Sequence, residues 1–452
     1  MAETTQAVTA APKQSRGQMV KSIVAGTIGN ILEWFDYGLY GYFAAIIAAN
    51  FYNTGDAMVA LIMSFMTFAM GFIVRPLGGL VVGIWSDKHG RIKAITFCVV
   101  AMGCCTFLMG CLPTYDQVGV LAPVLLTTLR IVQGLMCGGG FGSSLTFLPE
   151  YGAKFGKGFI CSFQPLSVGV GLLMGSGLGL FMSSVLSEAD LYSWGWRIPF
   201  LIGILISLYA FWMNRSVDES PEFTKMKEQQ EQQGEAAAEK PKLGLMFKQH
   251  WIGLIATVGM LCGASATYYL LITYMPTYIS QFLDTSFNSA FFINTGAICV
   301  YLIFTPIAGL LIDKIGPRWG AMIAAGCYVV AAYPVFSTLV NNVDSAFMAI
   351  AVIGILAIFQ ALLAVANCVI STEIFPTEVR NSGVGFAYNL AAAVFGGTAP
   401  MCATALIAGT GDVMSIVWLV FGSQAITFLT ALFILRHYYK GSRLKPEFEA
   451  WE

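Results

Sequence analysis

The sequence predicts an all-α membrane protein whose chain crosses a bilayer twelve times, and three features support this fold class. Of the 452 residues, 57% are hydrophobic and only 11% are charged, whereas a domain exposed to water carries about 25% charged residues. Apolar runs long enough to span a bilayer recur along the chain. The basic residues gather between these runs on alternate sides. Most of the molecular surface is therefore expected to face lipid.

The apolar runs divide the chain into two halves. A spanning helix needs about 20 apolar residues, and six such runs precede a polar interval while six follow it. We expect a cytoplasmic N-terminal segment (1–21), a six-helix bundle (22–213), a cytoplasmic linker (214–250), a second six-helix bundle (251–436) and a cytoplasmic tail (437–452). The runs begin near Ser22, Ala57, Ala94, Val118, Gly158, Arg197, Trp251, Ser289, Trp319, Ser345, Gly383 and Val413.

The distribution of basic residues predicts the orientation. Of the 24 lysines and arginines, all except Arg75, Arg130 and Arg197 fall in the terminal segments, the linker or the loops on one side of the predicted bundle. The loops on the other side carry acidic residues such as Asp56 and Asp116. Because positively charged loops stay on the cytoplasmic side, both termini are expected to be cytoplasmic. Arg197, at the mouth of its run, is expected to cap a helix end or to anchor the chain at the membrane interface, and contact with the substrate is the alternative.

A loop signature occurs once in each half of the chain. The sequence GIWSDKHGR at 83–91 matches GLLIDKIGPR at 309–318. An acidic residue also precedes a basic one by seven positions at Glu150 and Lys157, and again at Glu373 and Arg380. The two signatures recur at nearly the same offset, which indicates a duplicated six-helix unit. Parallel repeats in membrane carriers hold the substrate site between the two halves.

The charged residues of these loops are predicted to form a gate. An acid at one helix end and a base in a neighbouring loop can pair only when the cytoplasmic ends of the bundles meet, so the pairs would favour an outward-open state. Ordinary positive loop charge is the alternative interpretation. The predicted gating residues are Asp87, Arg91, Glu150, Lys157, Asp313, Glu373 and Arg380.

The sequence lacks the residues that several classes of protein require. A net charge of −1 argues against a nucleic-acid partner. The eleven cysteines show no C-x-x-C spacing and lie mostly inside apolar runs, which predicts packing rather than metal binding or disulfides. Neither a nucleotide-binding loop nor a metal cluster is recognisable, so we expect no enzyme activity and no cofactor.

Four charged residues lie well inside predicted spans, all of them in the first half: Glu33, Asp36, Arg75 and Arg130. A charge at bilayer depth costs about 2.5–3.5 kcal/mol on insertion scales, so each one is a candidate functional residue. Glu33 and Asp36 are three residues apart and share a helix face. Two carboxylates this close resist ionising together, so one of them is predicted to carry the transported proton. The sequence does not separate the two, and a permanent salt bridge with Arg75 or Arg130 is the alternative.

Arg75 is the first candidate for binding an anionic substrate, because its planar guanidinium matches a carboxylate. Arg130 is expected to do the same work or to relay the proton, and it could instead hold neighbouring helices together. Arg75 could instead act only as a counter-ion to Glu33 and Asp36. The second half contributes neutral groups, since hydroxyls and amides orient a ligand at a smaller desolvation cost than charges. The predicted substrate contacts are Arg75, Arg130, Tyr37, Gln164, Tyr269 and Asn389.

These residues stand within motifs that resemble a known family. The loop at 83–91 and the pattern of Arg130, Gln133 and Gly134 resemble the major facilitator superfamily. More narrowly, GNILEWFD at 29–36, RPLGG at 75–79 and WGWRIPF at 194–200 resemble its metabolite:proton symporters. The resemblance implies the major facilitator fold, with twelve helices in two six-helix bundles that alternate access around a central site. It also implies a monomer in the bacterial cytoplasmic (inner) membrane, with a small molecule and a proton as its partners.

Members of that family carry organic acids such as α-ketoglutarate, citrate or shikimate, or osmolytes such as proline and betaine. This chain departs from the family at Gly140, where a glutamate is usual. Two arginines then stand opposite two carboxylates, and protonation of one acid makes the site net positive. We therefore expect proton-coupled uptake of a small organic acid anion, such as a di- or tricarboxylate.

Two alternatives remain open. The segment 267–276 resembles the proline/betaine carriers, which favours a proton/osmolyte symporter, although the tail after Tyr439 contains no heptads for a coiled coil. A channel or a membrane sensor is the alternative from a different class. A sensor would need a signalling domain, and a channel would need no duplicated gate.

Overall fold

The computed structural model describes residues 30–31, 33–89, 91–147, 156–214, 248–441 and 443–445. The predictions for the N-terminal segment, for linker residues 215–247, for tail residues 446–452 and for Glu150 lie outside the described residues. So do the side chains of Asp87 and Arg91, although both residues belong to described helices.

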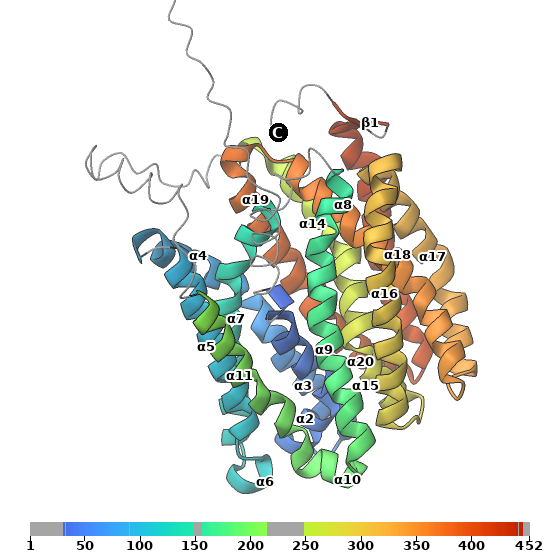
Figure 1. The fold of residues 1–452 in the computed structure, drawn as a ribbon. Coiled ribbons are helices and arrows are strands. Elements are labelled where there is room, and N and C mark those ends of the chain that lie inside the picture. The colour runs from blue at the N-terminus through green and yellow to red at the C-terminus, as the bar shows by residue number, and fades with distance from the viewer. Residues whose placement is uncertain are drawn as a thin grey trace, which may run out of the picture.

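The first bundle contains the elements up to residue 214 (Figure 1). Residues 33–42 are helical and lead into the first labelled helix. The elements are α2 (Ala44–Phe51), α3 (Ala57–Ile73), α4 (Arg75–His89), α5 (Arg91–Cys111), α6 (Tyr115–Val118), α7 (Leu121–Phe147), α8 (Lys157–Cys161), α9 (Phe163–Val185), α10 (Glu188–Asp190), the π-helical η2 (Leu191–Gly195) and α11 (Arg197–Asn214).

The second bundle follows the linker and ends in a small hairpin. Its elements are α14 (Trp251–Tyr268), the π-helical η4 (Tyr269–Thr273), α15 (Met275–Phe282), α16 (Phe287–Ile315), α17 (Pro317–Asn341), α18 (Ala346–Glu373), α19 (Thr377–Ala391), the π-helical η5 (Ala392–Gly397), α20 (Ala399–Thr410), the 3₁₀ turn η6 (Val413–Ser415), α21 (Ile416–Leu429), the π-helical η7 (Thr430–Ile434), the 3₁₀ turn η8 (Leu435–His437), β1 (Tyr439–Lys440) and β2 (Arg443–Leu444).

These elements make twelve spans, six in each bundle. In the described part of the chain, nine helical segments are long and apolar enough to cross a membrane. The shorter apolar helix Thr96–Cys111 forms a tenth span. Residues 30–51 and α11 complete the first bundle at its two ends. The predicted all-α organisation in two six-helix bundles is therefore confirmed.

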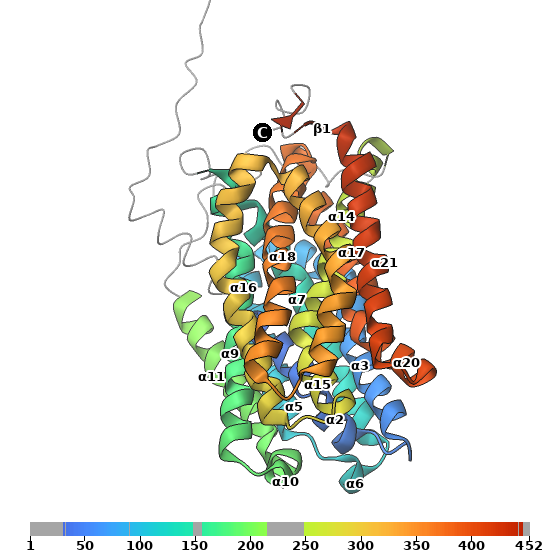
Figure 2. The ribbon, with the colours of Figure 1, turned by 90° about the vertical axis from the view of Figure 1, so that its right-hand side faces the viewer.

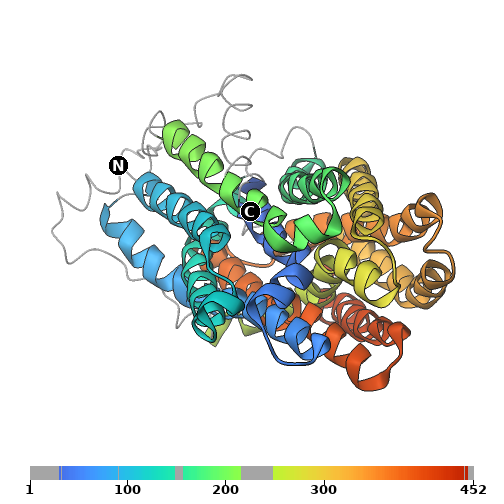
Figure 3. The same ribbon diagram turned by 90° about the horizontal axis from the view of Figure 1, so that it is seen from below.

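The two bundles stand side by side in Figures 1 and 3, and in Figure 2 the second bundle stands in front of the first. Helices α8 and α9 of the first bundle pack on α16 of the second, and α3 packs on η5 and α20. Glycine allows the close approach: a Cβ at Gly179 would collide with the ring of Phe291 in α16. Small residues at helix interfaces let backbones approach in the same way in other membrane proteins.

Inside the first bundle, glycines bring the backbone of α7 against α3 and α4. A Cβ at Gly134 would collide with the carbonyl oxygen of Gly71, and one at Gly138 would collide with the carbonyl oxygen of Arg75. Because these positions carry no side chain, the start of α4 lies directly against α7. This contact places Arg75 in the interior of the bundle.

Arg197 lies at the start of α11, where it binds carbonyl groups rather than the central region. Its Nη1 donates to the carbonyl oxygens of Gly110, at 2.8 Å, and of Leu112, at 2.6 Å. Both carbonyls belong to the C-terminal end of α5, where helix carbonyls lack partners within the helix. The predicted capping role of Arg197 is confirmed.

Candidate substrate and proton site

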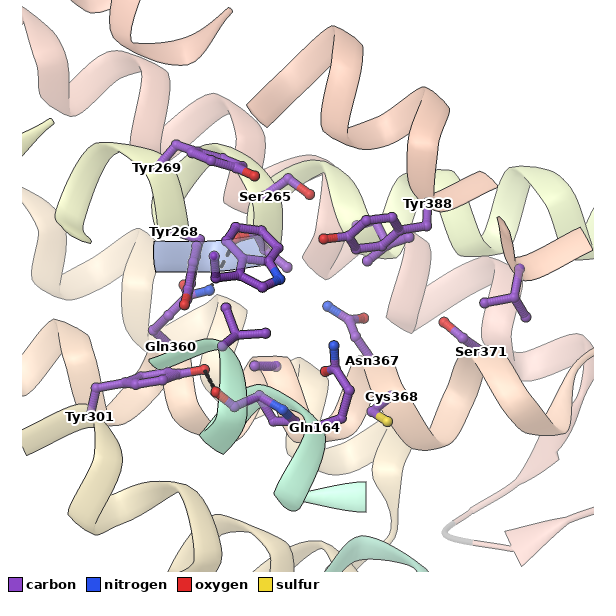
Figure 4. Close-up of a pocket in the computed structure, with 17 residues that line it drawn as sticks. Gln164, Ser265, Tyr268, Tyr269, Tyr301, Gln360, Asn367, Cys368, Ser371 and Tyr388 are labelled. Atoms are coloured by element: carbon purple, nitrogen blue, oxygen red, sulfur yellow. Dashed lines mark hydrogen bonds between the residues drawn. The ribbon is translucent and has the colours of Figure 1, made fainter. Parts of the chain in front are cut away.

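A central pocket lies between the two bundles (Figure 4). It contains about 660 Å³ of space, including the part open to solvent. The first bundle contributes Trp34 and the α9 side chain Gln164, and the other polar walls come from α14, η4, α16, α18 and α19. The polar and aromatic lining consists of Trp34, Gln164, Ser265, Tyr268, Tyr269, Tyr301, Gln360, Asn367, Ser371 and Tyr388.

Aromatic rings from both bundles meet in this pocket. The ring of Trp34 lies 5.9 Å from that of Tyr268, edge to face, and 6.1 Å from that of Tyr269. Tyr268 also meets Tyr301 of α16 at 5.9 Å. None of the described residues that line the pocket carries a formal charge. A ligand here would therefore meet ring faces and neutral hydrogen-bonding groups.

Several polar atoms of the lining have no hydrogen-bond partner within the described part of the protein. They are Trp34 Nε1, the hydroxyls of Tyr268 and Tyr269, and Asn367 Oδ1, all of them buried. Buried polar groups are normally paired, so a cluster of unpaired ones around a cavity points to a ligand or to water. The first three are donors, which suits a carboxylate oxygen.

The local sequence explains why Tyr269 enters the pocket. Pro276 and Pro400 stand at the start of α15 and α20, directly after the π-helical turns η4 and η5. Proline lacks an N–H donor and cannot continue the preceding ladder of hydrogen bonds, so the helix is locally widened. The two widened turns face each other, because a Cβ at Gly396 of η5 would collide with the ring of Tyr269.

Glu33 and Arg75 form an ion pair inside the first bundle. Arg75 Nη2 lies 2.8 Å from Glu33 Oε1, and the side chains are only 1% and 13% exposed. Arg75 also donates to the sulfur of Cys137, whose thiol donates to Glu33. The guanidinium lies 5.1 Å from the ring centre of Tyr37 and 5.2 Å from that of Phe72. Arg75 therefore lies outside the pocket lining, although Glu33 directly precedes the pocket residue Trp34.

Asp36 and Arg130 are also buried in the first bundle, and some of their polar atoms lack a partner among the described residues. Arg130 Nη1 donates to Gln133 Oε1 at 2.6 Å, and its guanidinium lies 4.3 Å from the ring centre of Tyr40. The Nε and Nη2 atoms of Arg130 and the Oδ1 atom of Asp36 have no hydrogen-bond partner among the described residues. Within the described residues, no ion pair joins Asp36 to a basic side chain at 4.0 Å or less.

The remaining predicted substrate contacts are distributed as follows. Gln164 and Tyr269 line the pocket. Tyr37 lies between the two guanidinium groups, 5.1 Å from that of Arg75 and 5.0 Å from that of Arg130, and its hydroxyl donates to the carbonyl of Gly71. Asn389 lies outside the lining and donates to the carbonyl of Gly385 at 2.9 Å.

Trp34 is the first-bundle aromatic residue of the pocket that sequence reasoning missed, together with Ser265, Tyr301 and Ser371 of the second bundle. It belongs to the motif at 29–36 but carries no charge, and a tryptophan in an apolar run is usually a packing residue. One feature of the sequence did indicate a role for Trp34 beyond packing. Tryptophan is concentrated at the membrane surfaces, whereas Trp34 stands between Glu33 and Asp36 at the depth of the intramembrane charges.

The predicted gate is partly described. The carboxylate of Asp313 accepts hydrogen bonds from the backbone amides of Gly158, at 2.7 Å, and Phe159, at 3.0 Å, across the bundle interface. Glu373 pairs with Lys157 at 3.5 Å, also across the interface. Asp313 thus binds the N-terminus of α8, which attracts negative charge, rather than a basic side chain as the sequence suggested. Arg380 donates to the carbonyl of Phe375 within its own bundle.

We refer to the end of the molecule that carries Lys157, Asp313 and Glu373 as the latch end. Contacts between the bundles also exist at the end that carries α10. Asn288 donates to Ser184 at 2.6 Å, and the ring of Tyr192 meets that of Phe287 at 5.5 Å. The described residues therefore hold the bundles together on both sides of the pocket.

Comparisons with known proteins agree with this architecture. The family model described as "Sugar (and other) transporter" matches residues 21–445. The α-ketoglutarate permease of Escherichia coli is 32% identical over 423 residues, which cover 94% of this chain and 95% of that protein. The citrate-proton symporter of Klebsiella pneumoniae is 33% identical over 397 residues, covering 88% and 87%.

The chain is also similar to a relative named for a second substrate class and to a solved structure that shares its fold. The proline/betaine transporter of Escherichia coli is 32% identical over 403 residues, covering 88% of this chain and 80% of that protein. A solved structure of the proton:xylose symporter XylE, of the major facilitator superfamily, superposes with a TM-score of 0.75 at 18% identity, covering 97% and 100%. This last similarity concerns the fold alone. The chain belongs to the sugar (and other) transporter family of the major facilitator superfamily, among the relatives of the metabolite:proton symporters.

Proposed function

We propose that the protein is a proton-coupled symporter that takes up a small carboxylate-bearing metabolite by alternating access. The observation that carries this proposal is an uncharged aromatic pocket between the two bundles. The first bundle also contains two buried carboxyl groups, each with a buried arginine in the same bundle: Glu33 with Arg75, and Asp36 with Arg130. The pocket supplies selective contacts. The buried acids supply a group that can bind and release a proton as access alternates.

The first candidate substrate is a small organic acid anion. The relatives named for α-ketoglutarate and citrate support this class. The unpaired donors of Trp34, Tyr268 and Tyr269 suit carboxylate oxygens. Arg75 lies in the first bundle, paired with Glu33, the residue directly before Trp34. A co-transported proton would neutralise one charge of the anion.

The second candidate is a zwitterionic osmolyte such as proline or betaine. The specific observation in its favour is the absence of any charged residue from the described pocket lining, together with the rings of Trp34, Tyr268, Tyr269, Tyr301 and Tyr388. Aromatic faces attract ammonium groups. A site of this kind binds a net neutral ligand without a compensating charge.

Uptake by proteoliposomes tests the proposal and separates these candidates. Labelled citrate, α-ketoglutarate, shikimate, proline and betaine are offered with an inward proton gradient, with and without a protonophore. We expect one class to accumulate and the protonophore to abolish its accumulation. Uptake that does not saturate, or that ignores the protonophore, would contradict proton-coupled symport.

Within the first bundle, we propose Asp36 rather than Glu33 as the proton-binding residue. Glu33 already has a basic partner at 2.8 Å, which favours its ionised form. Asp36 is buried and has no such partner within 4.0 Å among the described residues, and an unpaired buried carboxyl group is easier to protonate. Glu33 and Arg75 then act together as a nearly neutral unit beside the pocket.

The orientation and location follow from the basic residues. We propose that the latch end faces the cytoplasm, that both termini are cytoplasmic and that the protein works as a monomer in the bacterial inner membrane. The gradient of protons drives the cycle, without a cofactor, a nucleic-acid partner or an enzymatic step. The contacts of Asp313 and Lys157 would close the cytoplasmic side while substrate enters from the other side.

The unpaired hydroxyls provide a test of the pocket itself. Tyr268→Phe and Tyr269→Phe each remove one donor without changing the ring. We expect each variant to raise the KM for the identified substrate about tenfold to 150-fold, because a lost hydrogen bond to a charged group costs about 1.5–3 kcal/mol. Tyr278→Phe is the matched control, since its hydroxyl binds the carbonyl of Val413 outside the pocket. Unchanged KM values in both pocket variants would remove these donors from the site.

A further inference from the structure

The C-terminal tail folds against the latch end of the second bundle. The strands β1 and β2 pair in antiparallel register around Gly441, a glycine with φ of +68°. The amide of Lys445 donates to the carbonyl of Tyr438 at 2.9 Å, and Leu444 packs into the main hydrophobic cluster. Tyr439 is only 1% exposed. The start of the tail is therefore an integral part of this bundle.

The buried hydroxyl of Tyr439 hydrogen bonds to Oε2 of Glu373, the last residue of α18. The other carboxylate oxygen of Glu373, Oε1, lies 3.5 Å from Lys157 Nζ of the first bundle. One carboxylate thus touches the tail with one oxygen and the opposite bundle with the other. The tail and the bundle interface are joined through a single side chain.

The strength of this interface contact depends on how well Glu373 is fixed. Lys157 is 40% exposed, and an exposed pair of flexible side chains contributes little because ordering both of them costs entropy. When a buried hydroxyl holds the carboxylate in one orientation, part of that entropy cost is already met. A preorganised acceptor therefore makes the contact with Lys157 stronger than two free side chains would.

We propose that Tyr439 is a positioning residue of the latch, and that the C-terminal hairpin thereby sets the balance between the closed and the open latch end. Tyr439 acts only through Glu373 and touches neither substrate nor proton. Its role in transport rests on the alternating access proposed above. The contact itself exists whether or not the substrate is correctly identified.

Hydrogen–deuterium exchange of the full-length protein in detergent or nanodiscs tests this proposal without substrate. The reporting peptide contains Gly158 and Phe159, whose amides bind Asp313 only while the latch end is closed. We expect Tyr439→Phe to raise exchange in this peptide about threefold to tenfold, since one hydrogen bond to a charged group is lost. Peptides of α10, at the other end, should exchange at the wild-type rate. Equal exchange of the α8 peptide in wild type and variant would overturn the proposal.

Two comparisons separate positioning from a general loss of stability. Tyr278→Phe removes a hydroxyl that binds a backbone carbonyl elsewhere in the second bundle and should leave the α8 peptide unchanged. Lys157→Met removes the ion pair that Glu373 makes with the first bundle, so adding Tyr439→Phe to it should have no further effect on the α8 peptide. Fully additive effects of the two substitutions would show that Tyr439 acts independently of the latch.

A second variant covers the case in which Tyr439→Phe is not recovered in folded form. Glu373→Gln keeps the length of the side chain that Tyr439 contacts but removes the charge that pairs with Lys157. We expect folded Glu373→Gln protein to show raised exchange in the α8 peptide, as Tyr439→Phe does. Wild-type exchange in this folded variant would contradict the assignment. Because no arm of the experiment measures uptake, its failure is distinct from a failure of the proposed function.

Discussion

The substitution Asp36→Asn is expected to abolish proton-driven accumulation while leaving exchange of substrate intact. Asparagine has nearly the same shape as a protonated aspartic acid, so the variant behaves as a carrier that always holds its proton. Asp36 is 6% exposed and has no basic partner within 4.0 Å among the described residues. Removing its charge therefore breaks no ion pair described in the structure, and the protein should still fold.

Accumulation and counterflow are measured in the same proteoliposomes. For one coupled proton, a gradient of one pH unit supports about tenfold accumulation of substrate. The wild type should approach that ratio, whereas Asp36→Asn should stop at equal concentrations on the two sides. Counterflow exchange should stay within about threefold of wild type and lose its dependence on pH, because the remaining steps carry no titrating proton.

Glu33→Gln is the matched control for this experiment. It removes a carboxylate three residues away, but that carboxylate pairs with Arg75, so the variant should lose exchange as well as accumulation. If Glu33→Gln instead shows exchange without accumulation and Asp36→Asn still concentrates substrate, Glu33 is the proton-binding residue. If both variants concentrate substrate in response to a pH gradient, neither residue carries the proton.

The sequence predicted the positions of the important charges because hydrocarbon penalises them. Glu33, Asp36, Arg75 and Arg130 could be chosen by one criterion, their depth in apolar runs, and the structure places all four inside the first bundle. The same criterion cannot find Trp34, since a neutral ring costs nothing at that depth. Only the packing of α14 and η4 against it shows that its N–H faces a pocket.

Contacts between distant residues were beyond the reach of the sequence for a different reason. Cys137 of α7 lies 104 residues from Glu33, which belongs to the helical segment 33–42, and the two meet only in the folded bundle. Asp313 was predicted to bind a base, but the sequence does not show that α8 begins at Lys157 and offers free amides at Gly158 and Phe159. Helix ends bind anions through the backbone, which no side-chain pattern records.

The fold of the C-terminal tail also depends on contacts that the sequence does not show. Its sequence contains no heptads and no long apolar run, so it was expected to be a simple cytoplasmic extension. In the structure a four-residue pairing of strands, a glycine with positive φ and the burial of Tyr439 fix its start against α18. Each of these features is short, and each depends on a surface that the rest of the bundle supplies.

Arg75→Ala is expected to reduce uptake at least about 100-fold per molecule of protein. The guanidinium is 1% exposed, pairs with Glu33 and packs on the rings of Tyr37 and Phe72. Removing one partner of a buried ion pair costs about 3–5 kcal/mol, because the remaining charge is left without compensation. We therefore expect a smaller yield of folded protein in addition to the loss of transport.

The double variant Glu33→Gln/Arg75→Ala separates these two effects. It removes both charges, so the yield and the thermal stability should return towards the wild-type level. Uptake should remain at least about 100-fold lower, because the Glu33–Arg75 pair beside the pocket is still missing. Initial rates are compared after normalisation to folded protein measured by size-exclusion chromatography. A double variant that transports at near the wild-type rate would show that Arg75 only balances the charge of Glu33. An intermediate recovery in kcat, with a raised KM, would place Arg75 in substrate binding, as the sequence first suggested.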